Sequence, residues 1–295
     1  MQKILIVGSG DVARRILPLL RGRYRLYAVV RDPARGPAWR EAGATPLQAD
    51  LDVPGSLLRL TGLADVVLHL APPPGSGARD QRTRHLLAAL SRGKSLPRRF
   101  IYISTTGVYG DCGGAWIDET RPLNPESARA ARRVDAEQAV RRWGRDNGVA
   151  VSILRVPGIY AADRLPLERL EKGLPALSTA DDVFTNHIHA DDLARACLAA
   201  LHHATAARVI NVVDDSDLRM ADYFDAVADA FVLPRCPRLP RDELRASVSP
   251  VQWSFMRESR RIANGRLKKE LKFRFAYPTI FDGVRAALKE RKEAC

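Results

Sequence analysis

Residues 3–13 read Lys-Ile-Leu-Ile-Val-Gly-Ser-Gly-Asp-Val-Ala, and this stretch decides the fold. The run Lys3–Val7 is short and apolar and ends at a glycine, which predicts a buried parallel strand. Apolar side chains then recur at helical spacing over residues 11–21, which predicts a helix packed on a sheet. A strand that turns directly into a helix is the opening unit of an α/β fold.

The same strand-and-helix unit repeats along the first half of the chain. Further strand candidates lie at residues 24–30, 45–49, 65–71, 99–104 and 149–155, and the clearest helices between them lie at 79–91 and 128–147. Such alternation favours a doubly wound parallel sheet with right-handed crossovers. We therefore predict an α/β fold of the Rossmann type.

The turn after the first strand has the pattern GxGxxA. Gly8 permits a tight turn, Gly10 lets the backbone approach a pyrophosphate, and Ala13 lets the helix pack close to the strand. The helix N-terminus adds free N–H groups and a partial positive charge. Because the pattern follows a strand and opens a helix, we predict that residues 8–13 bind a dinucleotide.

The end of the second strand indicates which dinucleotide. A site selective for NAD usually places an acidic residue there for the ribose 2′-hydroxyl, whereas Arg31 suits a 2′-phosphate. Arg35 is placed to assist, and Asp32 lies one residue beyond Arg31. The sequence favours NADP over NAD, with NAD left open because of Asp32.

After residue 155 the pattern changes to loops rich in proline and charge, with isolated helices at 191–202 and 221–231. One more strand candidate, at 207–213, is placed to rejoin the sheet. We predict a dinucleotide-binding domain at 1–160. The remainder, 161–295, is expected to be a small, mostly helical and partly discontinuous substrate domain.

Composition narrows the function classes. The chain has 295 residues and a formal net charge of +13. No apolar run is long enough to span a membrane, and the N-terminus lacks the pattern of a signal peptide, so we expect a cytoplasmic protein without a membrane partner. The four cysteines form no metal-binding pattern, so no metal is predicted.

The basic segment 257–274 suggests nucleic acid as one partner. Its apolar positions Ile262, Leu267 and Leu271 instead give one buried side, with the cations on a solvated side. No nucleic-acid recognition motif accompanies the charge. The sequence therefore disfavours a nucleic-acid partner.

Several short motifs together resemble the extended short-chain dehydrogenase/reductase superfamily, of the NAD(P)-dependent epimerase/dehydratase type, and the GxGxxA loop is similar to its atypical branch. The motifs are Asp50-Leu51, His69-Leu-Ala-Pro72, Ser104-Thr-Thr-Gly-Val-Tyr-Gly110, Arg155-Val-Pro-Gly-Ile-Tyr160 and His187-Ile-His-Ala-Asp-Asp-Leu193. The resemblance implies that Asp50 and Leu51 contact adenine and that Ala71 lies along the cofactor. It also implies that Thr105 is the active-site hydroxyl residue.

In active members of that superfamily a Tyr-x-x-x-Lys pair supplies the acid/base and holds the ribose. When the resemblance is aligned on Pro125, Ser127 and Ala136-Glu137, the two positions fall on Arg129 and Arg133. A guanidinium is charged at all ordinary pH and is no proton shuttle near neutrality. An Arg at position 129 suits an anionic substrate or a developing oxyanion, and Arg133 suits a ribose or phosphate.

Two kinds of side chain are candidates to replace the missing acid/base. Tyr109 follows the fifth strand, where the loop faces the nicotinamide end, and it is a candidate surrogate acid. His187 and His189 are better explained as supports of the turn that contains them.

The resulting first hypothesis is an NAD(P)-binding, epimerase/dehydratase-like oxidoreductase. Its substrate would be small, with nucleotide sugars as one class. The alternative is a non-catalytic NADP(H)-binding protein that senses redox state or regulates a partner. Relatives pair two helices of the first domain, which leaves a homodimer open.

Overall fold

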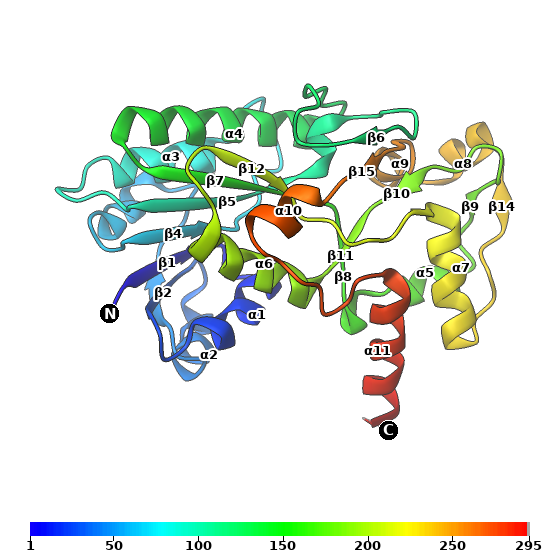
Figure 1. The fold of residues 1–295 in the computed structure, drawn as a ribbon, viewed down its shortest axis with the longest axis horizontal. Helices are drawn as coiled ribbons and strands as arrows, with labels where there is room; N and C mark the ends of the chain where they lie inside the picture. The colour runs from blue at the N-terminus through cyan, green and yellow to red at the C-terminus, as the bar shows by residue number, and fades with distance from the viewer. Residues whose placement is uncertain (294–295) are drawn as a thin grey trace.

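The computed structural model describes residues 1–293, and its centre is a seven-stranded, all-parallel sheet (Figure 1). The strand order is β12-β7-β5-β4-β1-β2-β3. The strands are β1 (Lys3–Val7), β2 (Arg25–Val30), β3 (Thr45–Gln48), β4 (Val66–His69), β5 (Arg99–Thr105), β7 (Ala150–Val156) and β12 (Arg208–Asn211). The predicted doubly wound parallel sheet is confirmed, and the strand order reverses between β1 and β4, where ligands bind in such sheets.

Helices cover both faces of the sheet (Figure 1). One face carries α1 (Asp11–Leu20), α2 (Gly36–Glu41) and α6 (Ala190–His203), and the other carries α3 (Gln81–Leu90) and α4 (Ala128–Asn147). Each face has its own apolar core, because alternate strand residues such as Ile4 and Leu5 point to opposite sides. Both are fully buried.

The second half of the chain forms a smaller lobe with its own core, which includes Leu177, Phe224 and Val284. Its helices are α5 (Leu167–Glu171), α7 (Met220–Phe231), α8 (Arg241–Ser247), α9 (Pro250–Met256) and α11 (Ile280–Glu293). Its short strands pair as β9 (Ala176–Leu177) with β14 (Arg238–Leu239) and as β10 (Phe184–Thr185) with β13 (Leu218–Arg219). The predicted boundary near residue 160 stays a prediction.

Parts of this second half return to the sheet. Strand β12 pairs with β7, as expected for residues 207–213, and α10 (Gly265–Glu270) contacts β12. Two further pairs of short strands are β8 (Gly158–Tyr160) with β11 (His187–His189) and β6 (Trp116–Ile117) with β15 (Arg261–Ile262). Short 3₁₀ turns lie at η1 (Pro33–Arg35), η2 (Pro54–Leu60), η3 (Thr106–Tyr109) and η4 (Ala162–Arg164).

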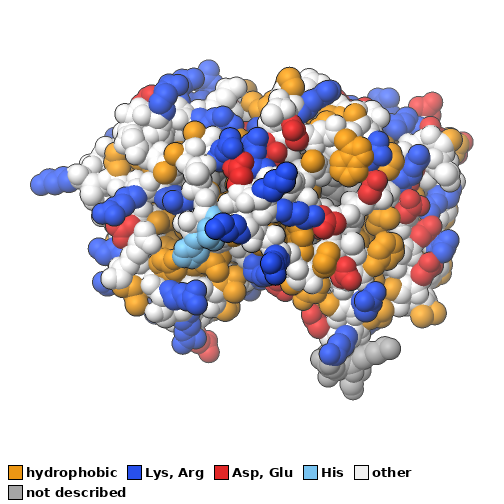
Figure 2. Space-filling model, viewed as in Figure 1, with side chains coloured by type: hydrophobic (Ala, Val, Ile, Leu, Met, Phe, Trp, Pro, Cys, Tyr) orange, Lys and Arg blue, Asp and Glu red, His pale blue; other side chains and the backbone are white. Residues whose placement is uncertain are grey.

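The basic segment 257–274 packs as the sequence predicted. Its apolar residues Ile262, Leu267 and Leu271 are buried. Several of its cations bind acids of the same chain, in the pairs Arg257–Glu126, Arg266–Glu119 and Lys268–Asp215. Figure 2 shows Lys and Arg spread over the visible face and interspersed with Asp and Glu. Within residues 1–293 no helix is both long and apolar enough to cross a membrane.

Candidate functional site

Two adjoining clefts lie at the carboxyl ends of the parallel strands. The loop cleft has a volume of about 500 Å³ and the inner cleft about 360 Å³. Val12, Leu70 and Ile159 line both, so the clefts form one continuous groove. Its size is typical of a small-molecule or cofactor site.

The glycine turn forms the floor of the loop cleft. Gly8 has φ +106°, and a Cβ there would lie 2.5 Å from the backbone nitrogen of Ala71. A Cβ on Gly10 would meet nothing within 4 Å, so the cleft is open at that point. Gly10 is the N-cap of α1 and brings no side-chain cap, which leaves the first N–H groups of the helix for an anion.

The structure brings together in the loop cleft all the residues that were predicted for the cofactor, apart from Arg133. They are Gly8, Ser9, Gly10, Asp11, Val12, Ala13, Arg31, Asp50, Leu51 and Ala71. Arg133 lines the inner cleft instead. Asp11 is neutralised by Arg15, whose Nε donates to its carboxylate at 3.1 Å, so its charge does not repel a phosphate strongly.

The tip of β2 and the turn after it bring two cations and one acid to the loop cleft, which Arg31, Asp32 and Arg35 all line. The Asp32 side chain accepts from the backbone N–H of Ala34 at 3.0 Å and so caps η1. Arg35 donates from Nη2 to the carbonyl of Ser9 at 3.0 Å, which places it over the glycine turn, and Arg31 lines the same cleft. Arginine side chains therefore flank this end of the cleft.

Sequence reasoning missed Arg82 and Arg164, which also line the loop cleft. Arg82 binds Asp52 through two hydrogen bonds of 2.8 and 2.6 Å, and this pairing holds the pKa of Asp52 below its usual range. No local pattern marks either arginine, because each reaches the cleft from an element distant in sequence from the glycine turn.

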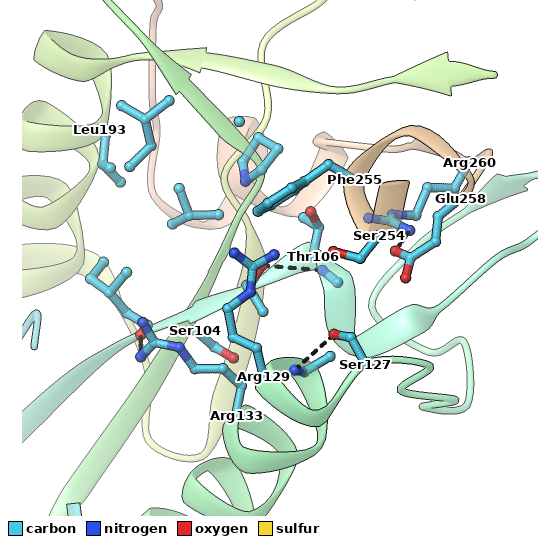
Figure 3. A pocket seen from close by; sticks show the side chains of 18 of the residues that line it. Ser104, Thr106, Ser127, Arg129, Arg133, Leu193, Ser254, Phe255, Glu258 and Arg260 are labelled. Carbon is cyan, nitrogen blue, oxygen red and sulfur yellow. Dashed lines mark hydrogen bonds and ion pairs between the residues drawn. The ribbon is translucent and has the colours of Figure 1, made fainter. Parts of the chain in front are cut away.

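Helix α4 supplies two arginines to the inner cleft. Ser127 caps the helix by accepting from the N–H of Ala130 at 3.2 Å. Arg129 and Arg133 follow one turn apart and line the cleft together with Thr105, as Figure 3 shows for the two arginines. The structure therefore brings together the three residues that the resemblance aligned with an active site.

Arg133 is anchored to the sheet. Its Nη1 donates to the carbonyl of Ile103 at 2.8 Å, to the hydroxyl of Tyr102 at 2.9 Å and to the carbonyl of Ala71 at 3.3 Å. All the hydrogen bonds that it donates within residues 1–293 start from Nη1, and Nε and Nη2 donate none there.

Arg129 has a different environment. Its guanidinium lies 4.1 Å from the centre of the Phe255 ring, and within the described residues it forms no ion pair. Burial lowers its pKa, and the positive charge of Arg133 lowers it further. Arg129 is therefore an exposed cation without an ion pair among those residues, and the charge of Glu258 compensates it only in part.

The two hydroxyl side chains at the end of β5, Thr105 and Ser104, differ in their hydrogen bonding. Thr105 Oγ1 accepts from the N–H of Gly107 at 3.2 Å. Ser104 is buried and lines the inner cleft, and its Oγ has no hydrogen-bond partner within the described residues. Sequence reasoning chose Thr105 and missed Ser104, although the adjacent hydroxyl was the signal that marked it.

The structure does not bring Tyr109 to either cleft. Its hydroxyl donates to Asn211 Oδ1 at 2.7 Å and accepts from Arg155 Nη1 at 2.9 Å, and its ring is buried. Burial raises its pKa. These contacts favour a packing role over that of a surrogate acid.

The two histidines of β11 lie outside the candidate site, and their role as supports of the turn stays a prediction. Both are buried and neither lines one of the two clefts. Burial lowers the pKa of His187 to about 3, so it is neutral at ordinary pH. The carbonyl of His187 accepts from the N–H of Asp214 at 2.8 Å.

Asp214 is expected to make stability depend on pH. Burial raises its pKa to about 7 from 3.8, with Asp215 and Asp192 adding to the shift. Between these values the Asp214 carboxyl of the folded state holds a proton that the unfolded state has lost, so its contribution to the free energy of unfolding falls as pH rises through this window. Asp214→Asn should remove this contribution, so that the variant gains more stability over the wild type at pH 8 than at pH 5, by up to about 4 kcal/mol at pH 8.

Urea unfolding at pH 5 and pH 8 measures this effect. Exposed Asp217 provides the matched control, because Asp217→Asn removes a carboxyl that lies in water. An equal gain in both variants, or a gain from Asp214→Asn that is no larger at pH 8 than at pH 5, would contradict the assignment to Asp214.

The chain is similar in sequence to a known protein family and to several curated proteins. The model of the NAD dependent epimerase/dehydratase family matches residues 4–213. A trifunctional UDP-glucose 4,6-dehydratase/UDP-4-keto-6-deoxy-D-glucose 3,5-epimerase/UDP-4-keto-L-rhamnose-reductase of Arabidopsis thaliana is 26% identical over 162 residues, which is 50% of this chain and 24% of that protein. A dTDP-glucose 4,6-dehydratase of Streptomyces niveus is 35% identical over 98 residues, 33% of this chain and 27% of that enzyme. The matches thus span about a quarter of each curated relative.

Solved structures match nearly the whole chain. A conserved protein of unknown function from Silicibacter pomeroyi has a TM-score of 0.79 at 29% identity and covers 98% of this chain and 99% of its own. UDP-glucuronic acid 4-epimerase from Bacillus cereus, in complex with UDP-glucuronic acid and NAD, has a TM-score of 0.76 at 19% identity over 99% of this chain and 100% of its own. The second likeness shows the fold.

Proposed function

Because the chain belongs to the NAD dependent epimerase/dehydratase family, we propose that it binds NADP(H) in the loop cleft, with the nicotinamide reaching the inner cleft. The observation that carries this proposal is the open cradle at Gly10, beside the uncapped N-terminus of α1. Phosphates bind at such helix ends because free N–H groups and the helix dipole both favour an anion. Family membership itself implies a nicotinamide dinucleotide.

The preference for NADP rests on charge. Arg31 and Arg35 are the cations nearest the end of β2, and the Asp32 carboxylate is engaged by the N–H of Ala34. An acid that caps a turn is less available to a ribose 2′-hydroxyl, whereas two guanidiniums suit a 2′-phosphate. Asp50, Leu51 and Ala71 would then lie along the adenosine half of the cofactor.

For the reaction, we propose an epimerase/dehydratase-like oxidoreductase in which Arg129 and Arg133 replace the usual Tyr-x-x-x-Lys pair. The bound nicotinamide would supply hydride transfer. Arg133, held by Ile103 and Tyr102, would direct its remaining N–H groups to the cofactor ribose, and Thr105 would orient the substrate. A positioned acid/base is worth about 10²–10⁴ in rate, so coupled alcohol oxidation should be slow.

Nucleotide sugars are the first substrate class to test, since one structural neighbour is in complex with UDP-glucuronic acid and NAD.

The second candidate function is a non-catalytic NADP(H)-binding regulator, which the arginine pair on α4 favours. Oxidation of NADPH with any carbonyl compound would count against it. A cytoplasmic location and a homodimer remain expectations.

The test is a thermal titration with NADP⁺, NADPH, NAD⁺ and NADH. A ligand at about 100 times its Kd adds roughly 2.7 kcal/mol to the free energy of unfolding. NADP(H) should stabilise more than NAD(H). Arg31→Gln should weaken NADP(H) binding about 10- to 100-fold while leaving NAD(H) unchanged, because only the phosphate contact is lost.

Arg23→Gln is the matched control, since Arg23 is exposed in the turn before β2 and lines neither cleft. If none of the four nucleotides raises the melting temperature, cofactor binding is excluded. If NAD(H) stabilises as much as NADP(H), the assignment to Arg31 fails while dinucleotide binding stands.

A further inference from the structure

The inner cleft has an excess of positive charge. Its ionisable lining residues are the three arginines Arg129, Arg133 and Arg260 and a single acid, Glu258. Glu258 binds Arg260 at 2.5 Å, and Arg260 also donates to the carbonyl of Gly110. Figure 3 shows this ion pair to one side of the two α4 arginines. The acid in the cleft therefore forms its ion pair with Arg260, and its charge compensates Arg129 only in part.

The two α4 arginines destabilise each other. They are four residues apart on a helix, where like charges are neighbours and repel. The repulsion is one reason that the pKa of Arg129 is lowered, after burial. Arg129 is exposed to solvent and Arg133 is half-buried. An anion placed between them would relieve the repulsion, because it neutralises part of the positive charge.

The buried hydroxyl of Ser104 is a second feature of the inner cleft that points to a ligand, and it does not depend on the charge of the arginines. Ser104 is 3% exposed, lines the same cleft, and its Oγ has no partner within residues 1–293. Figure 3 shows Ser104 with Arg129 and Arg133 among the side chains that line this cleft. A buried hydroxyl without a partner is unfavourable, and an acceptor oxygen on a ligand would satisfy it.

Phe255 orients the Arg129 guanidinium. The ring is 48% exposed, unusual for a large apolar side chain, and it lies against the guanidinium at 4.1 Å. Such a contact restricts the planar group, so that its N–H donors are held in one plane. A planar guanidinium matches the two oxygens of a carboxylate.

We propose that Arg129 and Ser104 form a subsite for a carboxylate of the substrate, beside the nicotinamide end of the cofactor. The substrate is accordingly an organic acid rather than a neutral alcohol or sugar. The subsite lies apart from the arginines of the loop cleft, Arg31 and Arg35, which would hold the cofactor phosphate. This inference rests on the proposed function for the position of the nicotinamide, and on this chain's own residues for the anion.

The test is calorimetric titration of the full-length protein with malonate and succinate at low ionic strength and saturating NADP⁺. Malonamide and succinamide are the uncharged isosteres, and inorganic phosphate is the non-planar anion. Bound NADP⁺ blocks the loop cleft, so that an anion is measured in the inner cleft. The dicarboxylates should bind and the diamides should not.

Substitutions assign the binding to residues. Arg129→Gln should weaken malonate and succinate about 10- to 100-fold, as loss of a charged hydrogen-bonding partner does. Ser104→Ala should weaken them about 2- to 10-fold. Arg141→Gln, an exposed arginine further along α4 that lines neither cleft, should leave binding unchanged. The melting temperature of each variant with NADP⁺ reports whether the fold is intact.

Unchanged carboxylate binding in Arg129→Gln would overturn the proposal, as would no carboxylate binding to the wild type or equal binding of the diamides. Binding of phosphate alone would overturn the carboxylate assignment. If NADP⁺ itself does not bind, the titrations are run without it. Carboxylate binding that Arg129→Gln abolishes would then support the subsite, even though the proposed cofactor had failed.

Discussion

Gly8→Ala is expected to lower both the stability of the fold and the affinity for a dinucleotide. The new Cβ would lie 2.5 Å from the nitrogen of Ala71, a backbone atom that cannot move without displacing the end of β4. The φ of +106° adds strain for any side chain. Together these effects should cost about 2–4 kcal/mol in the free energy of unfolding.

Gly10→Ala is the matched control, because it adds the same methyl group two residues away. Its Cβ would meet nothing within 4 Å, and its φ of −95° suits alanine. Stability should change by less than about 1 kcal/mol, while nucleotide affinity should fall at least about tenfold, since the methyl group occupies the space proposed for the pyrophosphate. Urea unfolding and nucleotide titration of both variants measure these effects. A Gly10→Ala variant that binds NADP(H) normally would contradict the loop assignment.

Glu137→Leu is expected to give the second large loss of stability. Arg155 and Glu137 are 3% and 2% exposed, and their side chains form two hydrogen bonds of 3.1 and 2.8 Å. Arg155 also donates to the buried hydroxyl of Tyr109. Removal of the carboxylate leaves a buried guanidinium without its counter-ion, which typically costs about 3–5 kcal/mol.

The double variant Glu137→Leu with Arg155→Met should recover much of that loss, because no charge remains buried. Arg145→Met is the surface control. Its pair with Asp146 is 76% and 54% exposed, so the change should be within about 0.5 kcal/mol. Chemical unfolding of the variants gives the comparison. A loss in Glu137→Leu no larger than in Arg145→Met would show that the buried pair does not stabilise the fold.

The network around Arg155 explains why Tyr109 was misleading as a sequence signal. A tyrosine that follows a parallel strand lies near the end where active sites form, and the sequence does not reveal its partners. In the structure it joins η3 to β7 and β12 through Arg155 and Asn211. Burial of the ring and pairing of the hydroxyl remove it from the cleft.

Local sequence determined the parallel sheet and the glycine turn of this protein. Short apolar strands ending at turns, helical periodicity between them, and the Gly8-Ser9-Gly10 turn are properties of neighbouring residues, so they can be recognised without the fold. Thr105, Arg129 and Arg133 were indicated only by the resemblance to a known family, and the structure brings the three to one cleft.

Only the tertiary structure decided what surrounds those residues. Arg82 and Arg164 reach the loop cleft from α3 and η4, and Phe255 reaches Arg129 from α9 in the smaller lobe. Whether Ser104 or Thr105 keeps a free hydroxyl depends on which one accepts from the N–H of Gly107. Such contacts follow from how distant segments pack and desolvate one another, and sequence periodicity contains no record of that packing.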